Sequence, residues 1–258
     1  MYTLDLSGKT GVVFGVANHR SLAWHIAGRL HEAGARLAFT YLGDRLKDKV
    51  GQLASTLPGS LLLPCDVTKD EEISRAFETI GSELGKVDYL VHSVAFANRE
   101  DLEGAFIETS RSGFRLAMEI SAYSLVRLAK EAAPLMESEG GSILTLTYMA
   151  SQRVVPSYNV MGSAKAALEH EVRQLAYELG PKGIRVNAIS AGPVNTLSAR
   201  GISGFTDMLQ ATREKAPLKR NIEPAEVASA ALFLLSEMGS GVTGEVLYVD
   251  AGYNIMGA

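Results

Sequence analysis

Short apolar runs alternate with longer helix-like stretches along the whole chain, and this alternation constrains the fold more than any other feature. Most runs lack a polar–apolar alternation, as expected of parallel strands covered on both faces. Parallel neighbours are joined by right-handed crossovers. We therefore predict an α/β fold, a single Rossmann-type doubly wound parallel sheet of about seven strands with helices on both faces. The expected strands are Thr10–Phe14, Arg36–Tyr41, Ser60–Pro64, Tyr89–Ser93, Ser142–Thr147, Arg185–Ser190 and Val246–Asp250.

The stretches between these strands carry helical patterns, and no linker, repeat or low-complexity segment separates them. Residues 1–258 are thus expected to form one dinucleotide-binding catalytic domain. The least regular stretch, at about 193–220, is a candidate substrate-binding lid with a short helix near Phe205–Lys215; an ordinary surface excursion is the alternative. The other expected helices are Ser21–Ala33, Asp44–Thr56, Lys69–Leu84, Gly113–Glu137, Tyr158–Leu179 and Glu223–Ser236.

Composition narrows the class of protein further. The hydrophobic fraction is 47% and the charged fraction 21%, as in ordinary globular proteins. A net charge of −4 gives no general attraction to nucleic acid or to anionic membranes. The single cysteine, Cys65, fits a reducing compartment, and neither a signal peptide nor a membrane-spanning run is visible. We expect a soluble cytoplasmic protein.

The histidines do not indicate a metal site. His19, His25 and His31 follow one another at intervals of six, and each is rotated by about 120° from the last on a helix. They cannot converge on one ion, so no metal is expected.

The stretch after the first strand has features of a dinucleotide-binding turn. Gly15 can form the tight turn, while Ser21 and Ala23 are small enough for close packing of helix on strand. Ser21 could also cap the helix and offer its hydroxyl to a phosphate. Glycine stands only at the first position of the usual GxGxxG pattern, so a generic loop and helix cap would look similar.

Later strand ends add to this interpretation. Asp66 follows the third strand, where its carboxylate could accept a bond from an adenine amine or could instead cap the next helix. His92–Ala95 follows the fourth strand, at the expected switch point. After the second strand no acid occurs before Asp44, and no basic pair is present, although Arg45 and Lys47 lie close. NADH is the favoured cofactor.

Tyr158 and Lys165 are the candidate catalytic pair. Seven helical residues turn about 700°, so both side chains lie on nearly one face, about 10 Å apart along the axis. A lysine charge could stabilise a phenolate, whose parent phenol otherwise has a pKa near 10. Surface decoration is the alternative for such a pair taken alone.

These motifs together resemble the bacterial NADH-dependent enoyl-[acyl-carrier-protein] reductases, a divergent branch of the short-chain dehydrogenase/reductase family. Classical ketoreductases match less well, because their Tyr-x3-Lys motif requires lysine where Gly162 stands. Leu42 departs from members that carry glutamine there. The stretches that carry the resemblance are Gly15-x5-Ser21-x-Ala23, Ala38-Phe-Thr-Tyr41, Cys65-Asp-Val67, His92-Ser93, Phe96-Ala97, Leu144-Thr-Leu-Thr-Tyr148, Tyr158-Asn-Val-Met-Gly162, Ala164-Lys165, Arg185-Val-Asn-Ala-Ile-Ser-Ala-Gly-Pro193, Gly244-Glu-Val246 and Val249-Asp250.

The resemblance implies roles for individual residues. Tyr158 would bond the thioester carbonyl, Lys165 the nicotinamide ribose, and Tyr148 would be the third catalytic residue; Ala97, Tyr148 and Tyr158 would contact substrate. It also implies an enoyl-chain-bearing acyl-carrier protein as partner and a homotetramer. The implied cofactor-binding residues are Gly15, Ser21, Leu22, Asp66, Val67, Val94, Lys165, Val194, Thr196, Leu197, Ser198 and Ala199.

The predicted function is reduction of the 2,3 double bond of trans-2-enoyl thioesters with NADH in fatty acid biosynthesis. A classical 3-oxoacyl or carbonyl reductase is the enzymatic alternative, and a nucleotide-binding protein without catalysis is the third.

One observation on the partner comes from charge alone. The stretch 200–220 holds five basic residues against two acidic ones, namely Arg200, Arg213, Lys215, Lys219 and Arg220 against Asp207 and Glu214. A docking patch for an acidic carrier and a solvated helix face both fit this excess.

Overall fold

The strands form one seven-stranded sheet, in the order β3-β2-β1-β4-β5-β6-β7, in which every neighbouring pair is parallel. The computed structural model describes residues 4–196 and 204–257. Every predicted strand is present within one residue at each end, and the predicted fold class is confirmed. The strands are β1 (Thr10–Phe14), β2 (Arg36–Tyr41), β3 (Leu61–Pro64), β4 (Tyr89–His92), β5 (Gly141–Thr147), β6 (Ile184–Ala191) and β7 (Val246–Val249).

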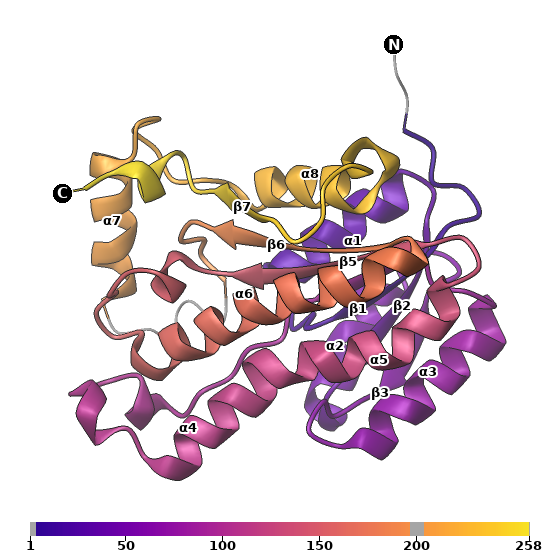
Figure 1. The fold of residues 1–258 in the computed structure, drawn as a ribbon, viewed down its shortest axis with the longest axis horizontal. Helices are drawn as coiled ribbons and strands as arrows, with labels where there is room; N and C mark the ends of the chain where they lie inside the picture. The colour runs from indigo at the N-terminus through magenta and orange to yellow at the C-terminus, as the bar shows by residue number, and fades with distance from the viewer. Residues whose placement is uncertain (1–3, 197–203, 258) are drawn as a thin grey trace.

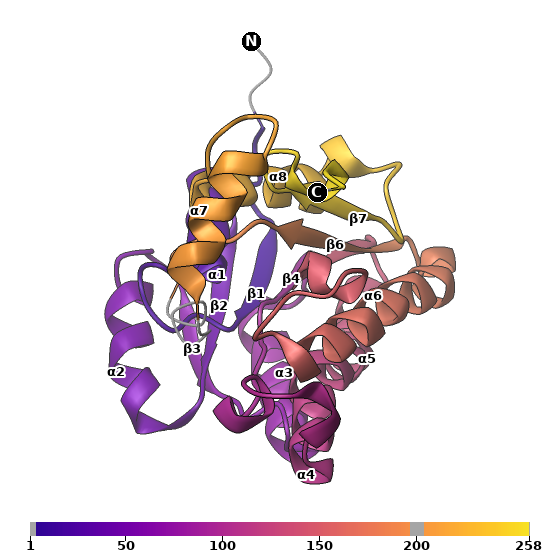
Figure 2. The ribbon, with the colours of Figure 1, turned by 90° about the vertical axis from the view of Figure 1, so that its left-hand side faces the viewer.

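Helices cover both faces of the sheet (Figures 1 and 2). One face carries α1 (Leu22–Glu32), α2 (Gly43–Ala54) and α8 (Pro224–Leu235). The other carries α3 (Asp70–Leu84), α5 (Ser124–Met136) and α6 (Asn159–Leu179). None of the helices in the described part of the chain combines the length and apolar character that a membrane span needs.

The helix predicted over Gly113–Glu137 is divided. It consists of α4 (Arg111–Met118), a π-helical turn over Glu119–Tyr123, and α5. It also begins earlier than predicted, because the Ser110 hydroxyl accepts the N–H of Gly113 at 2.9 Å and caps the first turn. The apolar pattern runs through all three segments, so it does not reveal the extra residue of a π turn.

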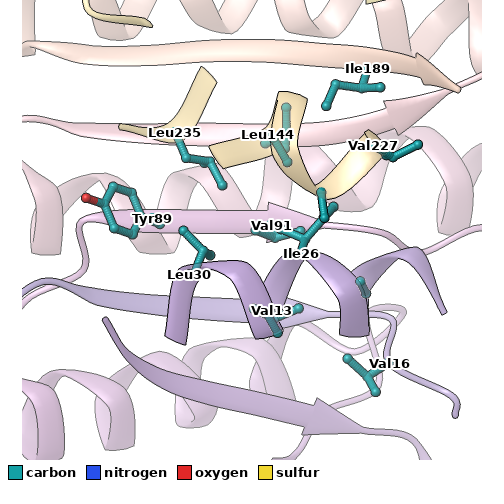
Figure 3. Close-up of a cluster of buried hydrophobic side chains, with 14 of the residues drawn as sticks. Val13, Val16, Ile26, Leu30, Tyr89, Val91, Leu144, Ile189, Val227 and Leu235 are labelled. Carbon is teal, nitrogen blue, oxygen red and sulfur yellow. The ribbon is translucent and has the colours of Figure 1, made fainter. Parts of the chain in front are cut away.

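The core explains why the strands lack alternation. Neighbours in register, such as Val13 and Val91, point to one face, whereas Val12 and Leu90 point to the other. Both sets are buried because both faces carry helices. Figure 3 shows the first face, where strand residues pack against α1 and α8; the labelled side chains are Val13, Val16, Ile26, Leu30, Tyr89, Val91, Leu144, Ile189, Val227 and Leu235.

Arg185, at the start of β6, closes the end of α8. Its Nη1 donates to the carbonyl oxygens of Leu234 (2.6 Å) and Val242 (3.2 Å), and its Nη2 to those of Leu235 and Ser236 (both 3.1 Å). The last carbonyls of a helix have no partner within the helix. A single guanidinium therefore satisfies the end of α8 and ties it to the sheet.

Candidate active site

A cavity of about 840 Å³ opens at the carboxyl ends of the strands, where ligands bind in doubly wound folds. The helix α7 (Phe205–Lys215) stands at this end of the sheet, toward which the arrowheads of β5 and β6 point (Figure 1). All predicted site residues that the structure describes line the cavity, whereas Leu197, Ser198 and Ala199 lie outside the described residues. Those in the lining are Gly15, Ser21, Leu22, Asp66, Val67, Val94, Ala97, Tyr148, Tyr158, Lys165, Val194 and Thr196.

Gly15 follows β1 and lies against the backbone of Ser93, which follows β4. Its φ is +93°, and a Cβ atom there would lie 2.0 Å from the carbonyl oxygen of Ser93. Only glycine fits such a conformation and such a contact. The first turn of the predicted dinucleotide site is therefore a true backbone cradle, even though the rest of GxGxxG is missing.

Ser21 occupies the N-cap position of α1 but does not cap its first turn. Its hydroxyl oxygen instead accepts the N–H groups of Ala17 (3.0 Å) and Asn18 (3.1 Å) in the loop before it. The cap expected from the sequence is thus wrong. The hydroxyl closes the loop that follows Gly15, and its hydrogen can still be donated to a phosphate.

Asp66 does not cap α3, which was one of its two interpretations. Its Oδ1 accepts the N–H (3.0 Å) and the hydroxyl (2.8 Å) of Thr68, and Lys69 takes the N-cap position. This turn leaves Asp66 in the cavity lining, where adenine recognition remains its predicted role.

The two predicted tyrosines lie in contact. The ring centroids of Tyr148 and Tyr158 are 5.0 Å apart, with the planes inclined by 56°. Tyr158 precedes α6 rather than belonging to it, and its neighbours Ser157 and Asn159 have φ values of +61° and +23°. Positive φ is costly for residues other than glycine, and such strain is often found at functional sites. The sequence argument placed Tyr158 inside the helix, but α6 begins one residue after it.

Lys165 is held in place by a backbone carbonyl group of β5. The residue is 6% exposed, and its Nζ donates to the carbonyl oxygen of Leu146 at 2.8 Å. Burial lowers the pKa of Lys165 to about 8, while the nearby Glu169 acts in the opposite direction. An ammonium group has three N–H donors. One N–H bond thus orients the group, and the others can serve a ligand.

The protonation state of Tyr158 differs from the one that the sequence suggested. Burial, and then the neighbouring Tyr148, raise the pKa of Tyr158 well above its ordinary value. Burial also raises the pKa of Tyr148 to about 12. The predicted phenolate is therefore wrong for this state of the site. Both phenols stay neutral near pH 7, and the O–H of Tyr158 can be donated to an oxygen in the cavity.

His92, which the sequence placed at the end of β4, is a buried residue that joins the elements around the site. Its Nδ1 lies 2.7 Å from the hydroxyl oxygen of Thr145, and its Nε2 lies 2.8 Å from that of Ser124. Because the Ser124 hydroxyl donates to the carbonyl oxygen of Ile120, His92 donates to it through Nε2. Burial lowers the pKa of His92 to about 3, so a neutral imidazole joins β4, β5 and α5.

Sequence reasoning missed the side chains that α7 brings over the cavity. Phe205 and Met208 are both in the lining, and the Tyr148 hydroxyl lies 3.3 Å from the sulfur of Met208. The predicted short helix has the predicted bounds, but nothing in its pattern indicates which residue meets Tyr148. Among residues 4–196 and 204–257, three or more candidate metal ligands never gather.

A doubly wound parallel sheet, a glycine turn after β1, and a tyrosine and lysine in one cavity beside it define a dinucleotide-dependent oxidoreductase of the short-chain dehydrogenase/reductase class. A family model described as enoyl-(acyl carrier protein) reductase matches residues 15–254. The chain belongs to the enoyl-acyl carrier protein reductase family.

Individual relatives agree with this assignment. The chain is 57% identical to the enoyl-[acyl-carrier-protein] reductase [NADH] of Bacillus cereus, over 98% of this chain and 99% of the relative. The crystal structure of the B. cereus enoyl-acyl carrier protein reductase with NADP+ and indole naphthyridinone superposes with a TM-score of 0.96 at 56% identity, over all of both chains. The reductase of Anaplasma phagocytophilum in complex with NAD gives a TM-score of 0.95 at 47% identity, over 100% of this chain and 98% of the other.

Proposed function

We propose that this protein reduces the 2,3 double bond of trans-2-enoyl thioesters carried by acyl-carrier protein, with NADH as the reductant in fatty acid biosynthesis. The observation that carries the proposal is the contact of Tyr148 with Tyr158 beside the buried Lys165, in a cavity at the carboxyl ends of the strands. Two phenol groups and one ammonium group suit a reaction that builds negative charge on a carbonyl oxygen.

The residues of the chain have distinct tasks in this reaction. When bound, the nicotinamide supplies the hydride that adds to the β-carbon of the conjugated thioester. Tyr158 donates its O–H to the thioester oxygen, whose negative charge grows as the hydride adds. Lys165 holds the ribose hydroxyls through the N–H groups not bonded to Leu146. Tyr148 packs on Tyr158 and, with Ala97, forms the wall for the acyl chain.

The residues also fit the cofactor. The Gly15 turn leaves no room for a side chain, which lets a pyrophosphate approach the backbone closely. At the adenosine end the lining from the last residues of β2 and the stretch after it consists of Thr40, Tyr41, Leu42 and Leu46, without arginine or lysine from that stretch. A 2′-phosphate would need such cations. NADH is therefore our proposal, although the B. cereus relative has been crystallised with NADP+.

Gly162 argues against the alternative function. A classical ketoreductase has its lysine four residues after the tyrosine, which is this position. Here a Cβ atom on Gly162 would lie 2.9 Å from the backbone carbonyl oxygen of Ala150. A lysine could enter only if the backbone moved. We therefore propose Lys165 as the catalytic lysine, as in the enoyl reductase pattern.

The partner and assembly remain proposals. Arg213, Lys215 and Lys219 are exposed on or just after α7, whereas Arg220 is engaged with Glu226 through two bonds of 2.7 Å. We propose that the first three cations, rather than the whole basic excess, meet the acidic carrier. Arg200 lies outside the described residues.

A homotetramer is supported by apolar side chains on the outer helices. Phe114 on α4 is 40% exposed, Tyr123 before α5 is 54% exposed, and Tyr177 on α6 is 80% exposed. Such faces are suited to pairing across a two-fold axis. Light scattering at micromolar concentration should give four times the chain mass; a monomer would contradict this. Cytoplasmic location remains a prediction from the sequence.

The proposed activity is tested by following NADH oxidation at 340 nm, roughly the absorption band of the reduced nicotinamide. Crotonyl thioester and acetoacetyl thioester are compared at equal concentration, each with NADH and with NADPH. We expect turnover of the crotonyl substrate with NADH. Turnover of the acetoacetyl substrate alone would favour a ketoreductase, and turnover of neither would favour a binding protein without catalysis.

A further inference from the structure

A buried carboxylate lies next to the lysine of the site without belonging to the cavity. Glu169 is 3% exposed and is not among the described residues of the lining. The Thr147 hydroxyl donates to its Oε1 at 2.8 Å. Glu169 follows Lys165 by four residues on α6, so the two side chains lie on the same side of the helix.

This contact is one of three made by consecutive residues at the end of β5. Leu146 and Thr147 bond Lys165 and Glu169 of α6, respectively, and Tyr148, the residue after β5, packs on Tyr158, the residue before α6. Lys165 and Glu169 are four residues apart, a spacing that keeps them on one face of α6. The carboxylate is therefore built into the same framework as the catalytic groups.

The burial of this carboxylate needs a physical reason. An ionised carboxylate is costly to bury unless charge or hydrogen bonds compensate it. The Lys165 ammonium is equally costly, and burial lowers its pKa to about 8 while Glu169 raises it. Each group thus offsets part of the cost of burying the other.

We propose that Glu169 is a positioning residue that keeps the ammonium of Lys165 charged and directed toward the nicotinamide ribose, with Thr147 as its anchor. The proposal rests on the role of Lys165 in the proposed function. It adds a second layer to the site, in which β5 holds both the lysine and the carboxylate that supports it.

Two of the titratable groups around the pair, His92 and Tyr248, do not change charge in the relevant range. His92 on β4 stays neutral because burial lowers its pKa to about 3. Tyr248 on β7 stays neutral because burial raises its pKa. Burial raises the pKa of Glu171 to about 7, but this residue is turned about 200° around α6 from Glu169. Above neutral pH, Lys165 is thus the group of the site that loses charge.

The sign of the expected effect follows directly. Charged Lys165 binds the ribose, so NADH affinity is lost as pH rises through the pKa of Lys165. Glu169→Gln keeps an oxygen that can accept the Thr147 hydrogen bond but removes the negative charge. The pKa of Lys165 then falls, and we expect the alkaline loss of affinity to move to lower pH by about one unit. Near pH 8 the variant should bind NADH about fivefold more weakly.

The experiment is a fluorescence titration of NADH into each folded protein across pH 6 to 9 (roughly the range below and above the lysine pKa). Glu169→Asp, which retains the charge, should restore the wild-type profile. Glu171→Gln is the matched control on the same helix, and it should leave the alkaline limb, which is the loss of NADH affinity at high pH, at the same pH as in the wild type. Thermal melting monitored by circular dichroism checks that every variant is folded.

The outcomes separate this proposal from the function on which it rests. Wild-type protein that fails to bind NADH would refute the proposed function. Wild-type binding with an unshifted Glu169→Gln profile, or equal losses in the Gln and Asp variants, would refute the role of Glu169. If the Gln variant does not fold, Thr147→Val tests the anchor, and it should move the limb in the same direction by a smaller amount; no movement would overturn the proposal.

Discussion

The glycine turn after β1 offers a test in which the structure predicts opposite effects for two similar substitutions. In Gly15→Ala the new Cβ would lie 2.0 Å from the Ser93 carbonyl oxygen, roughly 1.5 Å short of a good non-bonded separation. The backbone also has a φ of +93°, which costs an L-residue about 1–2 kcal/mol. Relieving the overlap by moving β1 from β4 adds about 1–3 kcal/mol. We expect a total loss of roughly 2–5 kcal/mol in the free energy of unfolding.

Gly28→Ala is the matched control in the same strand–helix unit. Gly28 lies inside α1, and a Cβ there would meet nothing within 4 Å. Alanine is the better helix former, so this variant should gain about 0.5–1 kcal/mol.

Urea denaturation gives both free energies, and NADH titration of the folded proteins gives the affinity. Gly15 and Ser93 line the cavity, so Gly15→Ala should also weaken NADH binding at least about tenfold, which is a loss of about 1.4 kcal/mol in binding free energy. Gly28→Ala should not weaken it. If Gly15→Ala matched the wild type in both stability and affinity, the close approach of β1 and β4 would not be what the site requires.

Three further predictions concern catalysis, docking and stability. Tyr158→Phe should slow enoyl reduction by a factor of about 10²–10⁴ and leave the affinity for NADH nearly intact. Lys165→Ala should weaken NADH binding and activity together. Loss of NADH binding in Tyr158→Phe would reverse these roles. Reversing the charges of Arg213 and Lys215 should raise the KM for carrier-linked substrate, most clearly at low salt, and leave a short uncharged thioester almost unaffected; equal losses on both would mean that α7 serves folding or closure. Arg185→Met should lower the free energy of unfolding by roughly 2–4 kcal/mol in urea denaturation, because four backbone acceptors lose a charged donor, and a change below about 0.5 kcal/mol would contradict that account.

Two residues of the site show where reasoning from the sequence stops. Asp66 was open to two roles, and only the position of Thr68 shows that its carboxylate closes a turn rather than capping α3. For Tyr158, a lysine seven residues further on was visible in the sequence, but burial and the adjacent Tyr148 raise the pKa of the phenol. Desolvation depends on every atom around the group, and the sequence does not list those atoms in space.

Properties that depend on short stretches of chain could be predicted from the sequence alone. The strand bounds, the short helix over Phe205–Lys215 and the glycine turn follow from local periodicity and from the backbone preferences of single residues. Gly15, Ser21 and Asp66 could be named because strand ends of a doubly wound sheet meet at one edge, whereas most of the other site residues were named from the resemblance to the enoyl reductases. Only the tertiary structure decided that Met208 meets Tyr148 and that Glu169 supports Lys165 from Thr147. Those contacts join α7 to the end of β5 and α6 to β5, and their distances and burial arise only when the whole chain is folded.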